Sequence, residues 1–143
     1  MKQIVLSIDQ MKNLQSLGLD VSDASVYWVR RSHGSDIRDE SKGNWFLSLQ
    51  KEFMTCGFTS YEVLPTFTLQ DILDKLPKCI ITDDYEFELN IYYHETGVSV
   101  FYDDGDIEQL VFFSESTILE SAYKMLCWCA ENGYLKGELR YGL

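Results

Sequence analysis

The chain has 143 residues, of which 45% are apolar and 14% aromatic, a composition that excludes an intrinsically disordered protein and suffices for one packed core. No run approaches the roughly 20 apolar residues of a membrane-spanning helix, and the first residues do not form the apolar segment of a signal peptide. We therefore expect a cytoplasmic protein with a single domain over residues 1–143, in which the four cysteines are reduced.

The formal net charge of −11 arises in one third of the chain. Residues 79–123 contain eleven of the 23 acidic side chains and no Lys or Arg, so the other twelve acids are balanced by the twelve bases. A surface of this kind repels nucleic acid and anionic membranes and attracts basic proteins. An acidic, solvated face without any partner has the same pattern, so both interpretations stay open at this level.

The first predicted helix covers residues 8–17. Ser7 and Gln10 stand at the two positions of a capping box, and Leu6 and Met11 stand at the two positions of a hydrophobic staple. Gly18 is expected to end this helix in the left-handed conformation.

Two strands and a second short helix are predicted next. The segments SVYWVRR (25–31) and NWFLSLQ (44–50) are rich in β-branched and aromatic residues, which is typical of strands. The second helix is predicted over residues 69–76, because Thr68 and Asp71 form a capping box before it and Pro77 follows its last residue.

The last third of the chain predicts a meander followed by a long helix. Strands are expected over residues 85–93, 98–102 and 107–113. A capping box of Thr117 and Glu120 opens a helix over residues 118–132. The predicted fold is therefore α+β: a single domain with an antiparallel sheet of about five strands, on which the long C-terminal helix and two short helices pack.

The Asp-Gly dipeptide at 104–105 predicts how the last two strands pair. It is a strong signal for a two-residue type I′ hairpin, in which both turn residues take a positive φ. Such a turn sets Asp103 opposite Asp106 and Tyr102 opposite Ile107, with Ile107 on the buried face.

A loop over residues 94–97 predicts the pairing of the first two strands of the meander. It sets Glu88 opposite Asp103, so the outward face carries the row Glu88–Asp103–Asp106, with Glu108 beside it. Like charges placed opposite each other cost about 0.2–1 kcal/mol per pair. Side chains that lower stability and have no evident structural role indicate a functional role.

This outward face is the candidate binding surface of the chain. Tyr92, Phe101 and Leu110 are predicted to lie among its acids, and apolar side chains among charges are typical of protein interfaces. The predicted partner is a basic protein, and its predicted contacts are Glu88, Tyr92, Phe101, Asp103, Asp106 and Glu108. Alternatively, a loop, the N-terminal helix or a second subunit covers the apolar side chains.

Trp128 is a further candidate contact. It falls on the side of the last predicted helix opposite the apolar stripe, where an exposed Trp would be a binding hot spot. The alternative, which we favour, is that the end of the chain covers it through Tyr134, Leu135 or Leu139.

Other kinds of site lack a motif. A carboxylate row supplies too few oxygens for Ca²⁺, and an open sheet face lacks the cleft that paired-carboxylate catalysis needs. His33 and His94 have no nucleophile and carboxylate at motif spacing. We therefore expect no metal and no other cofactor, and we favour a non-catalytic role over an enzymatic one.

Two other functions remain as alternatives. One is a small enzyme or ligand-binding domain whose site assembles only in three dimensions. The other is a mimic of DNA charge that inhibits a nucleic-acid-binding protein, which would require rows of carboxylates at phosphate-like spacing. Direct binding of nucleic acid or of a membrane is not expected, and the sequence does not determine an oligomeric state.

Three segments resemble small uncharacterised proteins encoded in prophages and other mobile elements of gut bacteria. They are IDQMKNLQSLGLDVSDAS (8–25), PTFTLQDILDKLPK (65–78) and AYKMLCWCAENGYL (122–135). The resemblance implies a genomic setting and no activity, because proteins of this kind have none assigned. The acidic segment of the meander lies outside the three matching stretches.

Overall fold

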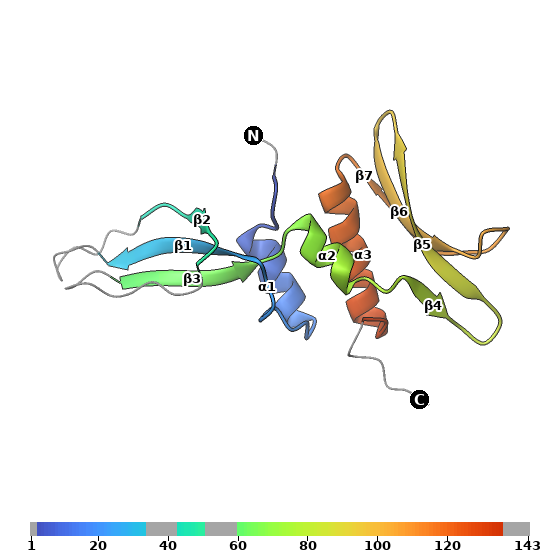
Figure 1. The fold of residues 1–143 in the computed structure, drawn as a ribbon, viewed down its shortest axis with the longest axis horizontal. Helices are drawn as coiled ribbons and strands as arrows, with labels where there is room; N and C mark the ends of the chain where they lie inside the picture. Colours follow the sequence, from blue (N-terminus) through green and yellow to red (C-terminus); the bar gives the residue numbers. More distant parts are fainter. Residues whose placement is uncertain (1–2, 34–42, 51–59, 136–143) are drawn as a thin grey trace.

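The computed structural model describes residues 3–33, 43–50 and 60–135. Within these residues, three helices and seven strands form an α+β fold with two antiparallel sheets. The molecule is elongated, with one sheet at each end and the helices between them (Figure 1). The α+β class and the long C-terminal helix are confirmed. The strands, however, divide into sheets of three and four, whereas the sequence predicted one sheet of about five.

The three helices begin where the capping side chains predict. They are α1 (Ile8–Ser16), α2 (Leu69–Lys75) and α3 (Ile118–Asn132). The capping boxes of Ser7 with Gln10 and of Thr68 with Asp71 are both formed. Thr117 caps α3 by accepting a hydrogen bond from the N–H of Glu120, at 3.2 Å. The Glu120 carboxylate instead accepts a hydrogen bond from the Gln10 side chain, which links α3 to α1.

The first sheet has the order β2-β1-β3. It consists of β1 (Val26–His33), β2 (Phe46–Ser48) and β3 (Ser60–Thr66). Strand β3 was not predicted, because Pro65 within it argues against a strand. Among the described strands β3 pairs with β1 alone, and an edge position of this kind tolerates a residue without a backbone N–H.

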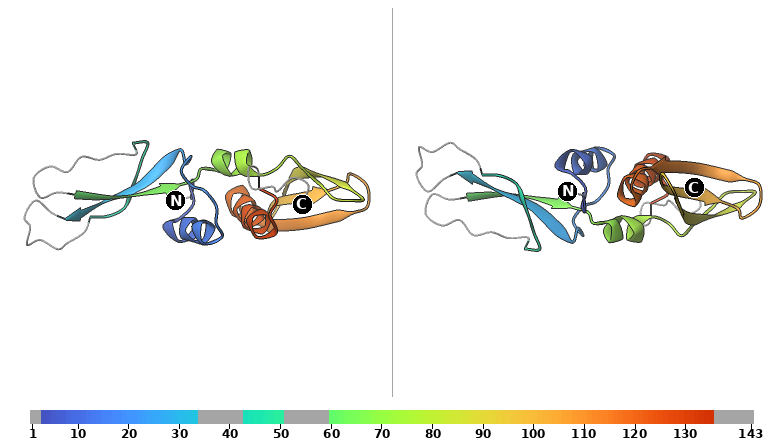
Figure 2. Two further views of the ribbon diagram at one scale, coloured as in Figure 1. Left: turned by 90° about the horizontal axis from the view of Figure 1, so that it is seen from below. Right: turned by 90° about the horizontal axis from the view of Figure 1, so that it is seen from above.

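The second sheet has the order β4-β5-β6-β7. It consists of β4 (Cys79–Ile81), β5 (Glu86–His94), β6 (Gly97–Asp103) and β7 (Gln109–Glu115). Helix α3 lies along one face of this sheet (Figures 1 and 2). Strand β4 was also missed, because three residues carry too little periodicity to predict a strand.

The pairing of β5 with β6 confirms the predicted register. Glu88 lies opposite Asp103 and Leu89 lies opposite Tyr102. The connecting turn is shorter than predicted, since His94 still pairs with Gly97.

The predicted pairing of β6 with β7 is wrong by four residues. Tyr102 lies opposite Val111, where Ile107 was expected. The cause is a longer loop: the Asp104 carboxylate accepts hydrogen bonds from the N–H groups of Asp106 and Glu108, at 2.9 and 3.1 Å. Asp104 has a negative φ, so the type I′ turn does not form.

A shift of four residues is even, so it preserves which side chains face α3. Ile107 is the exception, because it lies in the loop and is 83% exposed rather than buried. Leu110 was predicted on the outward face. A register irregularity at the start of β7 moves it, and it packs against the core.

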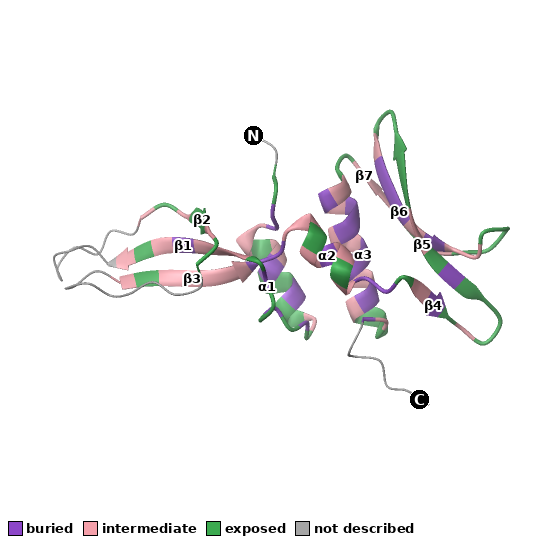
Figure 3. Ribbon diagram, viewed as in Figure 1, coloured by how far each residue is buried: buried purple, intermediate pink, exposed green. Residues whose placement is uncertain are grey.

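One continuous cluster of buried side chains joins the two ends of the molecule. It extends from Leu6 through Leu14 and Phe67 to the inner face of the second sheet, where Val100 and Tyr102 pack under α3. Figure 3 shows this buried zone along the helices and along the centre of β6. The core therefore lies on one side of the second sheet, and the opposite side is left at the surface.

Candidate partner-binding surface

The face of β5, β6 and β7 that points away from α3 is called the outer face below. All three helices lie on the other side of this sheet (Figures 1 and 2). The register places three rows of side chains across the outer face. These rows are Glu88–Asp103–Gln109, Asn90–Phe101–Phe112 and Tyr92–Ser99–Ser114.

The centre of the outer face is aromatic. Phe101 lies directly opposite Phe112, with ring centroids 5.8 Å apart. Phe112 remains 48% exposed and Tyr92 remains 62% exposed. The predicted candidates Tyr92 and Phe101 are thus joined by Phe112, whose position became visible only with the observed register. The described helices lie on the opposite side of this sheet (Figure 2).

One end of the outer face is acidic. The Asp103 carboxylate accepts hydrogen bonds from the Asn90 side chain, at 3.0 Å, and from the N–H of Gly105, at 3.2 Å. Neither Glu88 nor Asp103 forms an ion pair with a Lys or Arg of the described residues. The Asp103 carboxylate is therefore held by neutral donors, and no Lys or Arg of the described residues neutralises the charge of this end.

Asp106 and Glu108 do not extend the acidic row as predicted. Both lie exposed in the loop between β6 and β7, and Gln109 takes the position opposite Asp103. Both residues stay near Asp103 along the chain, because the loop that carries them begins after Asp103 and ends at Gln109, opposite Asp103. A continuous row of carboxylates across three strands, which DNA mimicry was expected to require, is not formed by these residues.

The other end of the outer face carries a polar cluster that sequence reasoning missed. The Nε2 atom of His94 lies 3.1 Å from the hydroxyl oxygens of both Ser99 and Ser114, and its Nδ1 atom lies 3.2 Å from that of Thr96. Three different strand segments supply these groups, so no spacing in the sequence could reveal them. Only the correct register of β6 with β7 would have revealed that Ser114 lies beside Ser99 and His94.

This cluster has part of the geometry of an activated nucleophile, since a serine lies within reach of a histidine. In such sites a third group orients the base, most often a carboxylate. Here the hydroxyl of Thr96 takes that position, and Ser99 is buried. The contacts instead tie the turn of the β5–β6 hairpin to β7, so we assign the cluster a structural role.

Trp128 does not belong to the outer face. It lies on α3, on the other side of the sheet, and its ring stacks on Tyr134 with centroids 5.4 Å apart. Trp128 is half-buried, and Leu135 is buried in the core. Of the three residues expected to cover Trp128, Tyr134 thus contacts it, and Leu139 lies outside the described residues. The His33 side chain and the whole of Cys56 lie outside the described residues.

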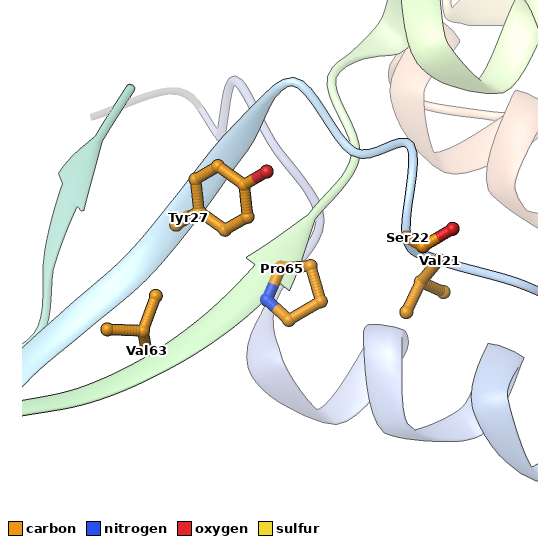
Figure 4. A pocket seen from close by; sticks show the side chains of 5 residues that line it. All are labelled: Val21, Ser22, Tyr27, Val63 and Pro65. Atoms are coloured by element: carbon orange, nitrogen blue, oxygen red, sulfur yellow. The ribbon is translucent and has the colours of Figure 1, made fainter. Parts of the chain in front are cut away.

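Two cavities offer alternatives to the outer face. A groove of about 420 Å³ lies between the N-terminal segment, the end of β5 and the start of α3. A smaller pocket of about 160 Å³ lies beside the first sheet and is lined by Val21, Ser22, Tyr27, Val63 and Pro65 (Figure 4). Ligand sites commonly have about 300–1,000 Å³, so the groove reaches this range and the smaller pocket does not.

Two of the groups with raised pKa values, Cys129 and Tyr102, belong to the core. Burial raises the pKa of the Cys129 thiol to about 12, and burial also raises the pKa of Tyr102 far above its usual range. Both side chains are fully buried, and the Tyr102 hydroxyl donates a hydrogen bond to the Pro77 carbonyl. A thiol with such a pKa is protonated and inert at neutral pH.

The described residues contain neither a metal-binding cluster nor a membrane-spanning helix. The described His, Cys, Asp and Glu side chains form no group of three or more that could hold a metal ion. The described helices include none with the length and apolar character needed to cross a membrane. No family model, no curated protein and no solved structure matches this chain.

Proposed function

We propose that this chain is a non-catalytic, cytoplasmic interaction protein that binds a basic protein through the outer face of its second sheet. The observation that carries the proposal is the exposed aromatic centre, Tyr92 and Phe112, next to carboxylates without a cationic partner in the described structure. Rigid aromatic side chains supply contact area, and the carboxylates steer and select a basic partner.

The geometry favours binding over catalysis. Glu88 and Asp103 lie next to each other on adjacent strands of one sheet face, an arrangement that does not by itself enclose a substrate between two carboxylates. Glu88 opposite Asp103 also lowers stability, and a binding role explains why the chain keeps both. An accessory role in a mobile element, which the resemblance suggests, is part of this proposal.

The test compares two variants with the same change in charge. Glu88→Lys with Asp106→Lys reverses two exposed charges at the acidic end, whereas Asp9→Lys with Glu131→Lys reverses two exposed charges on α1 and α3. Proteins recovered from host lysate are identified with each immobilised variant, and the affinity of the recovered partner is then measured by calorimetry at low and high salt.

The proposal expects a basic partner that binds the control variant like the wild type. Its affinity for the outer-face variant should fall at least tenfold at low salt, and the difference should narrow as salt screens the charges. Tyr92→Ser with Phe112→Ser should weaken the same complex. Equal binding by both charge variants would remove the outer face from consideration. The genes that neighbour this one test the mobile-element setting separately.

A further inference from the structure

The second sheet has an edge that the described strands leave partly open. Strand β4 pairs with β5 only from Glu86 to Glu88, and the N–H of Leu89 then donates to the Lys78 carbonyl, at 2.9 Å. In a strand, the backbone groups of every second residue point the same way. Those of Ile91 and Tyr93 therefore point past the end of β4, where no described strand pairs with them.

An apolar groove runs beside this open edge, on the side that faces the helices. It is the groove of about 420 Å³, and its lining includes Ile4, Leu69, Tyr93, Val98 and Ile118. Ile4 and Tyr93 are 69% and 67% exposed, so the groove has an apolar rim at the surface. An edge with unpaired backbone groups next to an apolar groove is the arrangement that takes up an extended peptide as an added strand.

Charge decides which occupant fits. Glu86, Glu88 and Glu95 are exposed on β5 and its turn, and residues 79–123 contain no Lys or Arg. Two copies pairing through β5 would bring these carboxylates together, and like charges on adjacent strands are unfavourable. A segment with basic side chains on one face meets the opposite charge instead.

We infer that the open edge of β5 binds an extended segment of the partner whose residues alternate between apolar and basic, as an additional antiparallel strand. Its apolar side chains lie over the groove at Tyr93 and Ile4. Its basic side chains lie on the outer face beside Glu88 and Tyr92, where a cation can also contact the exposed ring. The basic character of the segment rests on the proposed function, whereas the open edge and the groove do not.

The experiment uses the full chain and a nine-residue peptide of alternating lysine and valine with blocked ends. Hydrogen exchange of single amides is followed by NMR with and without the peptide. The amides of Ile91 and Tyr93 are expected to exchange at least tenfold more slowly when the peptide is bound. Those of Asn90 and Tyr92 point to β6, so they are slow already and serve as internal controls.

Two N-methylated peptides separate strand addition from simple charge attraction. In an added antiparallel strand the valine N–H groups face β5, so methylation of the valine nitrogens should lower the affinity at least tenfold. Methylation of the lysine nitrogens should leave it within threefold. Ile4→Ser with Tyr93→Ser should also lower the affinity, whereas Ile107→Ser, at an exposed loop position, should not.

Three results would overturn the inference. The first is equal binding of both methylated peptides without slower amide exchange at Ile91 and Tyr93. If Glu88→Lys with Asp106→Lys still weakens that binding, strand addition is wrong but the proposed function is retained. The second is no binding at millimolar peptide. The third concerns the protein without peptide: amide exchange at the same two residues becomes slower as protein concentration rises. A second copy of the chain would then occupy the edge.

Discussion

The hydroxyl of Ser121, on α3, donates a hydrogen bond of 2.6 Å to the carbonyl oxygen of Val98, on β6. The same oxygen of Ser121 accepts a hydrogen bond of 2.9 Å from the N–H of Glu115, at the end of β7. A single buried side chain thus fixes the start of α3 against two neighbouring strands. This contact helps to hold the helix on the inner face, and the outer face stays open.

Replacing Ser121 with Ala should lower the free energy of unfolding by about 1–3 kcal/mol, because the backbone groups that it satisfies would lose their partner in a buried setting. Urea denaturation measures the change. Ser116→Ala, at an exposed position just before α3, is the matched control and should change stability by less than about 0.5 kcal/mol. Similar losses in both variants would contradict the role given to Ser121.

In the observed register the Phe112 side chain contacts the Phe101 ring, whereas the Ile107 side chain is exposed to solvent. Phe112→Ser should lower stability by about 0.5–1.5 kcal/mol, since it removes the ring that contacts Phe101. Ile107→Ser should be nearly neutral, because that side chain is in solvent. Thermal denaturation of the two variants ranks them directly. A larger loss for Ile107→Ser would favour the two-residue hairpin that the sequence predicts.

Removing one charge from the outer face should stabilise the protein. Glu88→Gln ends the repulsion with Asp103 on the adjacent strand, and the expected gain is about 0.2–1 kcal/mol at low salt. The gain should shrink in 1 M salt, where charges are screened within a few ångströms. Glu95→Gln, at an exposed position in the β5–β6 turn, is the control and should show no such gain. A loss of stability in Glu88→Gln would mean that its carboxylate has a structural role.

Asp71 should make stability depend on pH in the acid range. Burial raises the pKa of this carboxyl, but hydrogen bonds from Ser25 and Thr68 outweigh burial and hold the pKa below its usual value of 3.8. A carboxyl with a lowered pKa contributes stability above its unfolded-state pKa, and this contribution is lost as pH falls below about 4. Asp71→Asn should therefore cost about 1–2 kcal/mol at pH 7 and much less near pH 2.

The comparison for Asp71 is Asp83→Asn, at an exposed position in the β4–β5 turn. Chemical denaturation at several pH values gives both curves. A difference between wild type and Asp71→Asn that stays constant down to pH 2 would show that the carboxylate form is not what stabilises the capping box.

Cys129 should make stability depend on pH in the alkaline range. Burial raises the pKa of its thiol to about 12, so the unfolded chain loses this proton at a lower pH than the folded protein does. The stabilising contribution is complete below about pH 9 and is lost as pH rises toward 12. Cys129→Ala should be less stable at pH 7, because it leaves a cavity, but its stability should fall less steeply above pH 9. Urea midpoints at pH 7, 9 and 10 measure both slopes, and equal slopes would contradict the assignment.

Local signals in the sequence were sufficient for the helices. The caps at Ser7, Thr68 and Thr117 act within one turn of the chain, and each helix begins directly after its cap. Gly18 and Gly133 take positive φ values where the helices were predicted to end. The β5–β6 register was also predictable, because alternating side chains and a short turn fix it within one hairpin.

The errors concern contacts between segments that the sequence does not place next to each other. The Asp-Gly dipeptide at 104–105 predicted a two-residue turn. The Asp104 carboxylate instead accepts hydrogen bonds that stabilise a longer loop, and this loop places Phe101 opposite Phe112. The division into two sheets depends on how β3 and β4 pair, and neither strand has a clear pattern of its own. The contact of His94 with Ser114 joins β5 to β7 across β6, and the pairing of β6 with β7 had been predicted four residues out of register.

The three capped helices, the β5–β6 hairpin and the concentration of negative charge in residues 79–123 were predictable from the amino-acid sequence, because each of them depends on neighbours along the chain. Three features could be read only from the folded chain: which side chains share the outer face, how the acids relate to the aromatic rings, and that no described strand pairs with the second half of β5 on the β4 side. These features depend on the pairing of strands and on the side of the sheet that α3 covers, and both are settled by packing over the whole chain.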